Sequence, residues 1–236
     1  MKNREIVWLP DEDKDFVRSL LIDEDDEMLA FNKPAGLACQ TRNSKDRTLD
    51  KLLWAFAKSN GKRPRLVHRI DADTTGVVIA AKTQPSAAAL SKAFEDRQIK
   101  KTYLAFTEGD ATKVTRCDSP IGTVRTSEGA TISGIGGQAG VKDTKEALTR
   151  FNCVWTDGHR SLVECRPETG RMHQIRVHLA HLGHPILGDG IYGDAGNAPR
   201  LMLHALRLQG PHPWGSQFDY SAPVPDDFER LSVDLT

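Results

Sequence analysis

Short apolar runs bounded by turn residues recur along the chain and predict strands. The run Val77-Val78-Ile79-Ala80-Ala81 is β-branched or small throughout, which is typical of a strand buried on both faces. Two alternating runs, 151–155 and 161–165, flank a polar segment and predict a β-hairpin. Further strands are expected over 29–34, 101–106 and 201–208.

Apolar residues at helical spacing predict three helices between these strands. The first follows Thr48, a favourable N-cap, and runs to Ala57. The second opens at Pro85 and has an apolar face of Ala89, Leu90, Ala93 and Phe94. The third covers about 172–182 and ends at Gly183. Residues 122–140 are rich in glycine and predict turns and mobile loop. A few helices among many short strands indicate an α+β fold.

Composition narrows the class of protein. The chain of 236 residues is 39% hydrophobic and 27% charged, as globular proteins are. It has no apolar run long enough to span a membrane and no signal-peptide core. The four cysteines, Cys39, Cys117, Cys153 and Cys165, form no CxxC pair, which disfavours a zinc ribbon or a disulfide framework and favours a reducing, cytoplasmic location.

The charge is zero overall but unevenly distributed. Residues 11–27 hold nine acidic side chains, whereas residues 28–218 hold 27 lysines and arginines against 17 aspartates and glutamates, a net charge of +10. A basic body suits a polyanionic partner, because lysine and arginine neutralise phosphates and release counterions. An ordinary solvated surface explains the same charge without any partner.

Two dense polar clusters carry the candidate chemistry. The first, His68 to Gly76, precedes the buried strand and places Asp71 on a loop at the strand edge. The bland alternative is that Asp71 forms a turn or a cap. The second cluster is Gly170 to His178, where His173 and Arg176 lie one helical turn apart. An arginine beside Asp71 would hold that carboxylate in its ionised form, and its planar fork does this better than a lysine.

Other types of site have less support. The histidines His173, His178, His181 and His184 suggest a metal, but no carboxylate lies among them and the i, i+4 pair of a zincin is absent. No Walker loop and no GxSxG elbow occur. Tyr103, which follows two lysines on a predicted strand, is suited to stack on one base, although a core tyrosine is the simpler interpretation.

Six sequence blocks together resemble the RluA-type pseudouridine synthases. They occur in the order and spacing of that family, and the similarity extends from about Leu29 to about Asp227. Within the Asp71 block, Ile70 and Thr75 replace the usual Leu and Ser, which preserves size and hydroxyl. The blocks are 32–37, 68–76, 101–105, 170–178, 182–193 and 203–205.

The resemblance implies a role for each matched residue. Asp71 corresponds to the essential aspartate that initiates breakage of the C1′–N1 bond of a target uridine, Arg176 to the arginine that pairs with it, and Tyr103 to the tyrosine that stacks on the extruded uracil. Arg69 corresponds to an arginine that contacts RNA near the flipped base. Further RNA contacts are expected from the neighbouring residues Lys33, His68, Lys101, Arg171 and His173.

The resemblance also implies the architecture and the partner. The expected fold is a mixed, largely antiparallel sheet in two halves with the active-site cleft between them, without metal or organic cofactor. Residues 1–28 are expected to form an acidic leader and residues 29–236 the catalytic domain, a short form without an S4-like domain. The expected partner is a stem-loop of ribosomal or transfer RNA, bound by a monomer. The two alternatives are a catalytically silent RNA-binding module of the same fold and a metal-dependent hydrolase.

Overall fold

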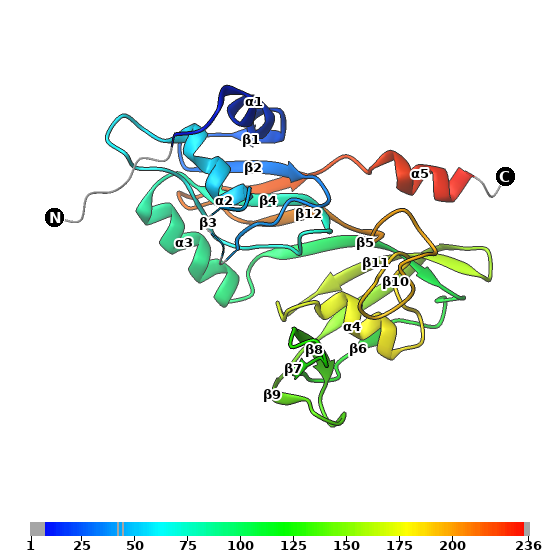
Figure 1. Ribbon diagram of the computed structural model, residues 1–236. Coiled ribbons are helices and arrows are strands. Elements are labelled where there is room, and N and C mark those ends of the chain that lie inside the picture. Colours follow the sequence, from blue (N-terminus) through cyan, green and yellow to red (C-terminus); the bar gives the residue numbers. More distant parts are fainter. Residues whose placement is uncertain (1–7, 42, 44, 234–236) are drawn as a thin grey trace. The chain divides into compact units, whose positions relative to one another are not determined.

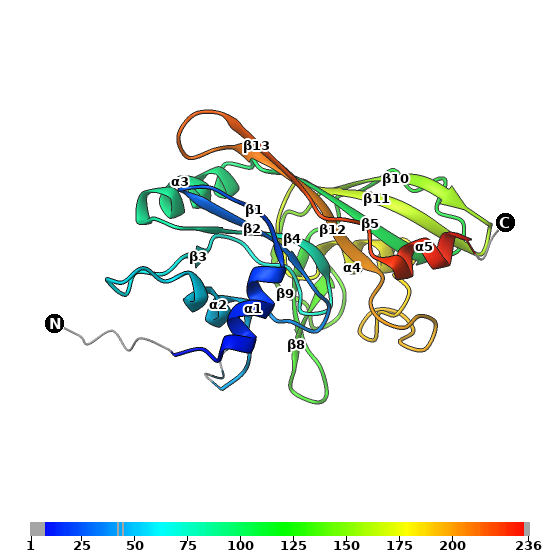
Figure 2. The same cartoon turned by 90° about the horizontal axis from the view of Figure 1, so that it is seen from above.

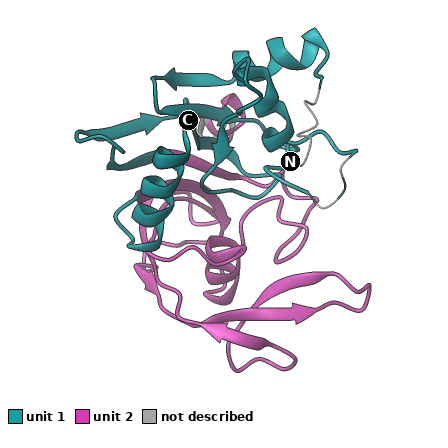
Figure 3. Ribbon diagram, turned by 90° about the vertical axis from the view of Figure 1, so that its left-hand side faces the viewer, with its two compact units in different colours: residues 1–99, 207–223 teal, residues 100–206, 224–236 magenta. Residues whose placement is uncertain are grey.

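A computed structural model describes residues 8–41, 43 and 45–233. The chain forms two compact units, each assembled from two separate stretches (Figure 3). Unit 1 comprises residues 1–99 and 207–223, and unit 2 comprises residues 100–206 and 224–236. Within the described ranges, no helix is long and apolar enough to cross a membrane.

Unit 1 is organised by antiparallel strands (Figure 1). Strand β2 lies between β1 and β4, and the short β3 also pairs with β4. In the second stretch of unit 1, the β12 residues from Arg207 onward pair with β13. The bounds are β1 (Leu21–Glu24), β2 (Met28–Lys33), β3 (Arg65–Leu66), β4 (Thr75–Ala81), β12 (Leu203–Pro211) and β13 (Gln217–Ser221).

The central strand β4 is buried along its whole length, as its apolar run predicts. The side chains on one face of β4 pack in one cluster with Leu90 and Ala93 of helix α3 (Gln84–Glu95). Leu208 and Phe218 of the second stretch belong to the same cluster. Thr83 caps α3 by accepting the backbone N–H of Ser86. The predicted apolar face is present at Leu90, Ala93 and Phe94, but Ala89 is exposed and Ala87 is buried in its place.

Residues set apart as an acidic leader form part of unit 1. Helix α1 (Asp11–Ser19) lies beside α2 (Leu49–Leu52), and β1 pairs with β2 (Figure 2). Thr48 caps α2 as predicted, by accepting the N–H of Lys51 at 3.2 Å. The helix expected to reach Ala57 is α-helical only to Leu52 and continues as the 3-10 helix η1 (Leu53–Phe56).

Unit 2 contains a four-stranded antiparallel arrangement in the order β5-β11-β10-β6 (Figure 1). The predicted hairpin is confirmed, because β10 pairs with β11 and Phe151 lies opposite Cys165. A core cluster, which includes Phe106, Val163 and Leu179, joins these strands to helix α4. The bounds are β5 (Lys100–Glu108), β6 (Arg116–Cys117), β10 (Thr149–Thr156), β11 (Arg160–Pro167), α4 (Gln174–His181) and α5 (Asp226–Val233).

The prediction of turns and mobile loop over 122–140 is wrong for residues 122–125 and 131–135, which form strands, whereas turns lie at 126–130 and 136–140. This region contributes to a second sheet of three antiparallel strands, β7 (Ile121–Arg125), β8 (Thr131–Ile135) and β9 (Lys142–Lys145), in the order β8-β7-β9. The glycines allow close approach between strands: a Cβ on Gly122 would lie 2.2 Å from the carbonyl oxygen of Lys142. Ile121 and Ile135 pack against Val177 of α4, so this outer sheet is attached to the helix.

Candidate active site

The loop that carries Asp71 lies immediately before β4 in unit 1. The N–H of Thr74 donates to the carbonyl of Asp71 at 3.2 Å and closes a turn, and Gly76, the second residue of the strand, has a φ of 109°. Asp71 is half-buried, whereas Arg69 and Asp73 are exposed. The sequence therefore places an acidic side chain on the loop before a fully buried strand, as predicted.

Lys33 ties this loop to the preceding strand. On β2 it lies opposite Gly76 of β4, and its side chain is completely buried. Its ammonium group donates to the carbonyl oxygens of Pro34 and Leu37, both at 2.8 Å, and of Ala72 at 2.7 Å. These three bonds match the three donor hydrogens of a lysine. The prediction that Lys33 contacts RNA is therefore corrected: burial withdraws it from the surface, and it holds the backbone next to Asp71.

His68 also stabilises the entry to the loop. Its Nε2 accepts the backbone N–H of Ile79 at 2.9 Å, so that nitrogen carries no proton. Its ring stacks on Phe94 of α3, with centroids 4.7 Å apart. These contacts fix His68 against β4 and α3, and its predicted contact with RNA stays a prediction.

In unit 2, Arg176 projects from α4 toward the segment that follows the helix. Its Nε donates to Oδ2 of Asp189 at 2.8 Å and its Nη2 donates to Oδ1 at 2.7 Å, a two-bond fork. Both residues are buried, with exposed fractions of 6% for Arg176 and 1% for Asp189. A bidentate pair of this kind fixes the plane of the guanidinium as well as its position.

Asp189 is ionised and held from two sides. Burial disfavours its charged form, but the hydrogen bonds and charge of Arg176 outweigh that effect, so the pKa of Asp189 lies below its usual value. Its Oδ1 also accepts the backbone N–H groups of Ile191 and Tyr192, at 3.0 and 3.2 Å. The sequence prediction missed Asp189 as a functional residue, although it lies within one of the matched blocks.

Tyr192 lies against the other side of the arginine. The Cζ of Arg176 is 5.3 Å from the centre of the Tyr192 ring, within the range of cation–π attraction. The hydroxyl accepts the backbone N–H of Ser133 on β8 at 2.9 Å and bonds Nδ1 of His173, also at 2.9 Å. Burial raises the pKa of Tyr192 to about 12, so the hydroxyl keeps its proton near neutral pH.

His173 is the N-cap of α4 in an unusual conformation. Its φ of 53° and ψ of 22° lie in the left-handed region, where a non-glycine residue costs on the order of 1 to 3 kcal/mol. The imidazole packs edge-on to Tyr192 at 5.7 Å in addition to its hydrogen bond. The structure thus gives His173 a partner within the protein, whereas its predicted contact with RNA stays a prediction.

A buried network of hydrogen bonds joins α4 to neighbouring segments of unit 2. His178 bonds Thr149 Oγ1 through Nδ1 at 2.9 Å and the Ser119 carbonyl through Nε2 at 3.0 Å. Because a carbonyl only accepts, Nε2 carries the proton and Nδ1 accepts from Thr149. Burial lowers the pKa of His178, which favours this neutral form. Gln174 joins the network through Thr149 and Thr169.

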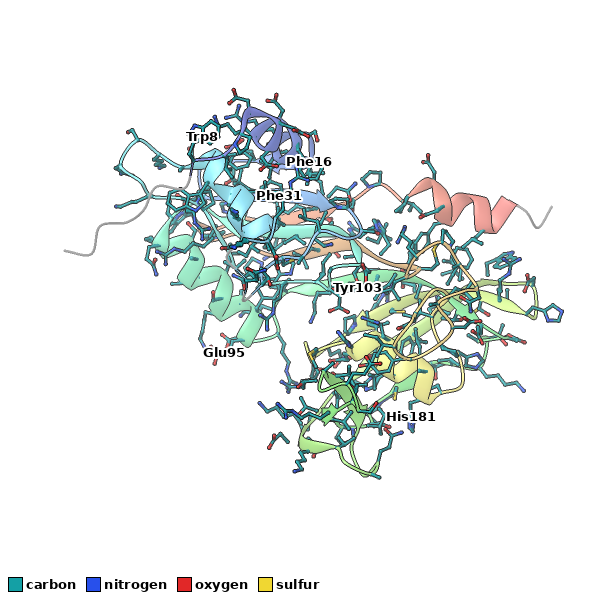
Figure 4. All side chains as sticks on the ribbon, in the orientation of Figure 1. Trp8, Phe16, Phe31, Glu95, Tyr103 and His181 are labelled. Atoms are coloured by element: carbon teal, nitrogen blue, oxygen red, sulfur yellow. The ribbon has the colours of Figure 1, made fainter. Side chains whose placement is uncertain are left out.

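The remaining predicted residues lie on unit 2. Tyr103 is half-buried on β5 opposite Cys165 and packs against the core cluster (Figure 4). The ammonium group of Lys101 donates to the carbonyl of Thr169 at 2.8 Å, and Nε of Arg171 donates to the carbonyl of Glu146 at 2.9 Å. Both basic side chains are partly exposed, and their contacts with RNA stay predictions.

The candidate residues divide between the two units. Asp71 and Arg69 share one loop of unit 1, and Tyr103 and Arg176 belong to unit 2. The pairing of Asp71 with Arg176 stays a prediction, whereas the pairing of Arg176 with Asp189 is observed. In the described part of the chain, no three histidine, cysteine or acidic side chains form a group suited to a metal ion.

Comparison with known proteins finds a matching family and relatives that cover most of the chain. The family model described as RNA pseudouridylate synthase matches residues 27–181. Ribosomal large subunit pseudouridine synthase D of Zymomonas mobilis is 36% identical over 231 residues, which cover 89% of this chain and 71% of that protein. An uncharacterised RNA pseudouridine synthase of Bacillus subtilis is 38% identical over 216 residues, which cover 88% of this chain and 69% of that protein.

Two solved human structures share the fold. RNA pseudouridylate synthase domain containing 4 superposes with a TM-score of 0.74 at 24% identity, covering 95% of this chain and 98% of that chain. RNA pseudouridylate synthase domain containing 1 has a TM-score of 0.70 at 28% identity, covering 87% and 83%.

Proposed function

The chain belongs to the RNA pseudouridylate synthase family, among its RluA-type members, and we propose that Asp71, Tyr103 and Arg176 carry the reaction. The protein is an RNA pseudouridine synthase, an isomerase. The reaction breaks the C1′–N1 bond of a uridine, turns the uracil in place and joins C1′ to C5. The proton displaced from C5 leaves, and N1 ends protonated, so no oxidant or reductant is required.

The observation that supports Asp71 most strongly is the tethered loop. Lys33 and His68 fix the chain on both sides of it, and β4 anchors its end. A preorganised carboxylate is needed whether it attacks C1′ or removes the 2′ proton to leave a glycal. The family match spans Asp71, Tyr103 and Arg176 together.

The other two residues are assigned complementary tasks. Tyr103 stacks on the extruded uracil, which retains the free base while it turns. Arg176 supplies a positive charge to the reacting region, with its orientation set by Asp189. Arg69, exposed two residues before Asp71, binds a phosphate near the flipped nucleotide, and Lys101, Arg171 and His173 extend the RNA surface. Such contacts offset the unstacking cost, about a few kcal/mol.

For the substrate, we propose ribosomal RNA of the large subunit. The support comes from relatives named ribosomal large subunit pseudouridine synthase D, at 36% identity in Zymomonas mobilis and 33% in Vibrio vulnificus. A structured stem-loop fits an enzyme that must flip a base out of a stack. Transfer RNA is the competing substrate.

The test maps pseudouridine in the RNA of a deletion strain and its parent. We expect one or more sites in large-subunit ribosomal RNA to be lost and then restored by the wild-type gene but not by one encoding Asp71→Asn. Loss confined to transfer RNA would overturn the substrate proposal while leaving the reaction intact. Restoration of all sites by Asp71→Asn would overturn the catalytic assignment.

A further inference from the structure

Arg176 lies between two groups that hold it from different directions. Asp189 binds the edge of the guanidinium through two hydrogen bonds, and Tyr192 presents its ring to the guanidinium at 5.3 Å. Asp189 also accepts the backbone N–H of Tyr192, so the two groups are linked to each other. We call Asp189 and Tyr192 the arginine clamp.

The aromatic half of the clamp is itself fixed at its far end. The Tyr192 hydroxyl takes the N–H of Ser133 from β8 and bonds His173 at the start of α4. Ser133 is buried, and its own hydroxyl donates to the carbonyl of Met172. The ring is therefore held by the outer sheet and by the helix that carries Arg176.

From this arrangement, we propose that Tyr192 is a positioning residue that sets the orientation of Arg176 for the reaction. Asp189 fixes the fork through its two oxygens. The Tyr192 ring adds a second contact, 5.3 Å from the guanidinium carbon, which restricts how the guanidinium can turn. The proposal rests on the proposed role of Arg176, because orientation affects the rate only if Arg176 takes part in the reaction.

The kinetic test uses Tyr192→Phe and Tyr192→Leu. Tyr192→Phe keeps the ring but removes both hydroxyl contacts, and Tyr192→Leu removes the ring as well. We expect the single-turnover rate at saturating RNA to fall about tenfold for Phe and about a hundredfold for Leu, with RNA affinity unchanged, as misplacement of a reacting group does. If both variants instead bound RNA more weakly and kept the wild-type single-turnover rate, the proposal would be overturned.

A double-mutant cycle separates positioning from general destabilisation. In an Arg176→Lys background, which lacks the planar fork, Tyr192→Phe should cost less than twofold. A full tenfold loss in that background would mean that Tyr192 does not act through Arg176. Tyr220→Phe is the matched control: it makes the same chemical change at a buried tyrosine of unit 1, and its turnover should equal that of the wild type.

A spectroscopic measurement tests the clamp independently of activity. The NMR signal of the Arg176 Nε–H should move in Tyr192→Leu, which loses the ring current, and should move far less in Tyr192→Phe. An unchanged signal in Tyr192→Leu would overturn the clamp. If instead Arg176→Lys is fully active while the signal moves as expected, the proposed catalytic role of Arg176 fails and the clamp stands.

Discussion

Lys33 in unit 1 and Arg176 in unit 2 are both buried cations, but they bind different kinds of partner. Lys33 donates to three backbone carbonyls, whereas Arg176 donates to the two oxygens of one carboxylate. A cation bound to carbonyls fixes the path of a loop. A cation bound to a carboxylate becomes fixed itself. Unit 1 therefore uses its lysine to locate the backbone that carries Asp71, and unit 2 uses Asp189 to locate the arginine.

The largest expected effect follows removal of the Asp71 carboxylate in unit 1. Asp71→Asn should abolish tritium release from RNA labelled at C5 of uridine, because an amide neither attacks C1′ nor removes a proton. The tethers of the loop involve backbone atoms and Lys33, so the fold and RNA affinity should be retained. Activity within tenfold of the wild type would contradict the assignment of Asp71.

The carboxylate of unit 2 is tested by Asp189→Asn. Breaking a buried ion pair leaves an uncompensated charge, and the free energy of unfolding should fall by about 3–5 kcal/mol. Urea unfolding at pH 7 measures this loss. Arg207→Met serves as the control because its pair with Asp219 is exposed, and it should cost less than about 1 kcal/mol.

The same pair predicts a response to acid. The folded-state pKa of Asp189 lies below the ordinary value of 3.8, so its stabilising contribution is complete above that pH and is lost as the pH falls through the lowered pKa. The difference in free energy of unfolding between the wild type and Asp189→Asn should therefore become smaller as the pH drops below 3.8. A deficit that is constant with pH would mean that the pair does not stabilise unit 2 through charge.

The backbone tether of unit 1 is tested by Lys33→Met. Three carbonyls, one buried and two partly buried, lose their donor. Since an unsatisfied buried group costs about 1–3 kcal/mol and the partly buried ones can be hydrated, we expect a loss of about 2–3 kcal/mol. Turnover should fall as well, because Ala72 adjoins Asp71. Lys92→Met, an exposed lysine on α3, is the control and should change neither quantity. An unchanged free energy of unfolding in Lys33→Met would mean that Lys33 does not fix the loop backbone in unit 1, and the contrast with Arg176 in unit 2 would fail.

The smallest effect concerns the neutral histidine behind α4. Because the folded-state pKa of His178 is lowered from 6.5, the unfolded chain binds the proton more readily, and stability should fall as the pH drops below 6.5. One such group contributes at most about 1.4 kcal/mol for each pH unit. His178→Gln can keep both hydrogen bonds without titrating and should flatten the slope in urea unfolding between pH 7 and 5. An identical slope would assign the effect to another group.

Regular strands were predictable because their apolar pattern reflects burial directly. The strand over 77–81 and the hairpin at Phe151 and Cys165 are present as expected. The outer sheet was not predictable from glycine content, since Gly122 serves close packing between strands and not a turn. Local composition does not distinguish these two uses of glycine.

The site was predictable only as far as motifs extend. Asp71 lies on the expected loop, but Lys33, a basic residue within a matched block, was predicted to contact RNA, and its burial is a tertiary property. Asp189 was missed for a related reason. Gly183, with a φ of 83°, turns the chain after α4 and brings Asp189 back to Arg176, a pairing that sequence spacing does not reveal.

The division of both units into separate stretches has a consequence for biosynthesis. The core of unit 1 needs Leu208 and Phe218, which follow about a hundred residues of unit 2 in the chain. At roughly 5–20 residues per second, the first stretch of unit 1 waits roughly 5–20 seconds on the ribosome before its own core can close. During that interval the apolar face of β4 lacks these two side chains. Nascent-chain stability should therefore rise only after residue 218 has left the exit tunnel.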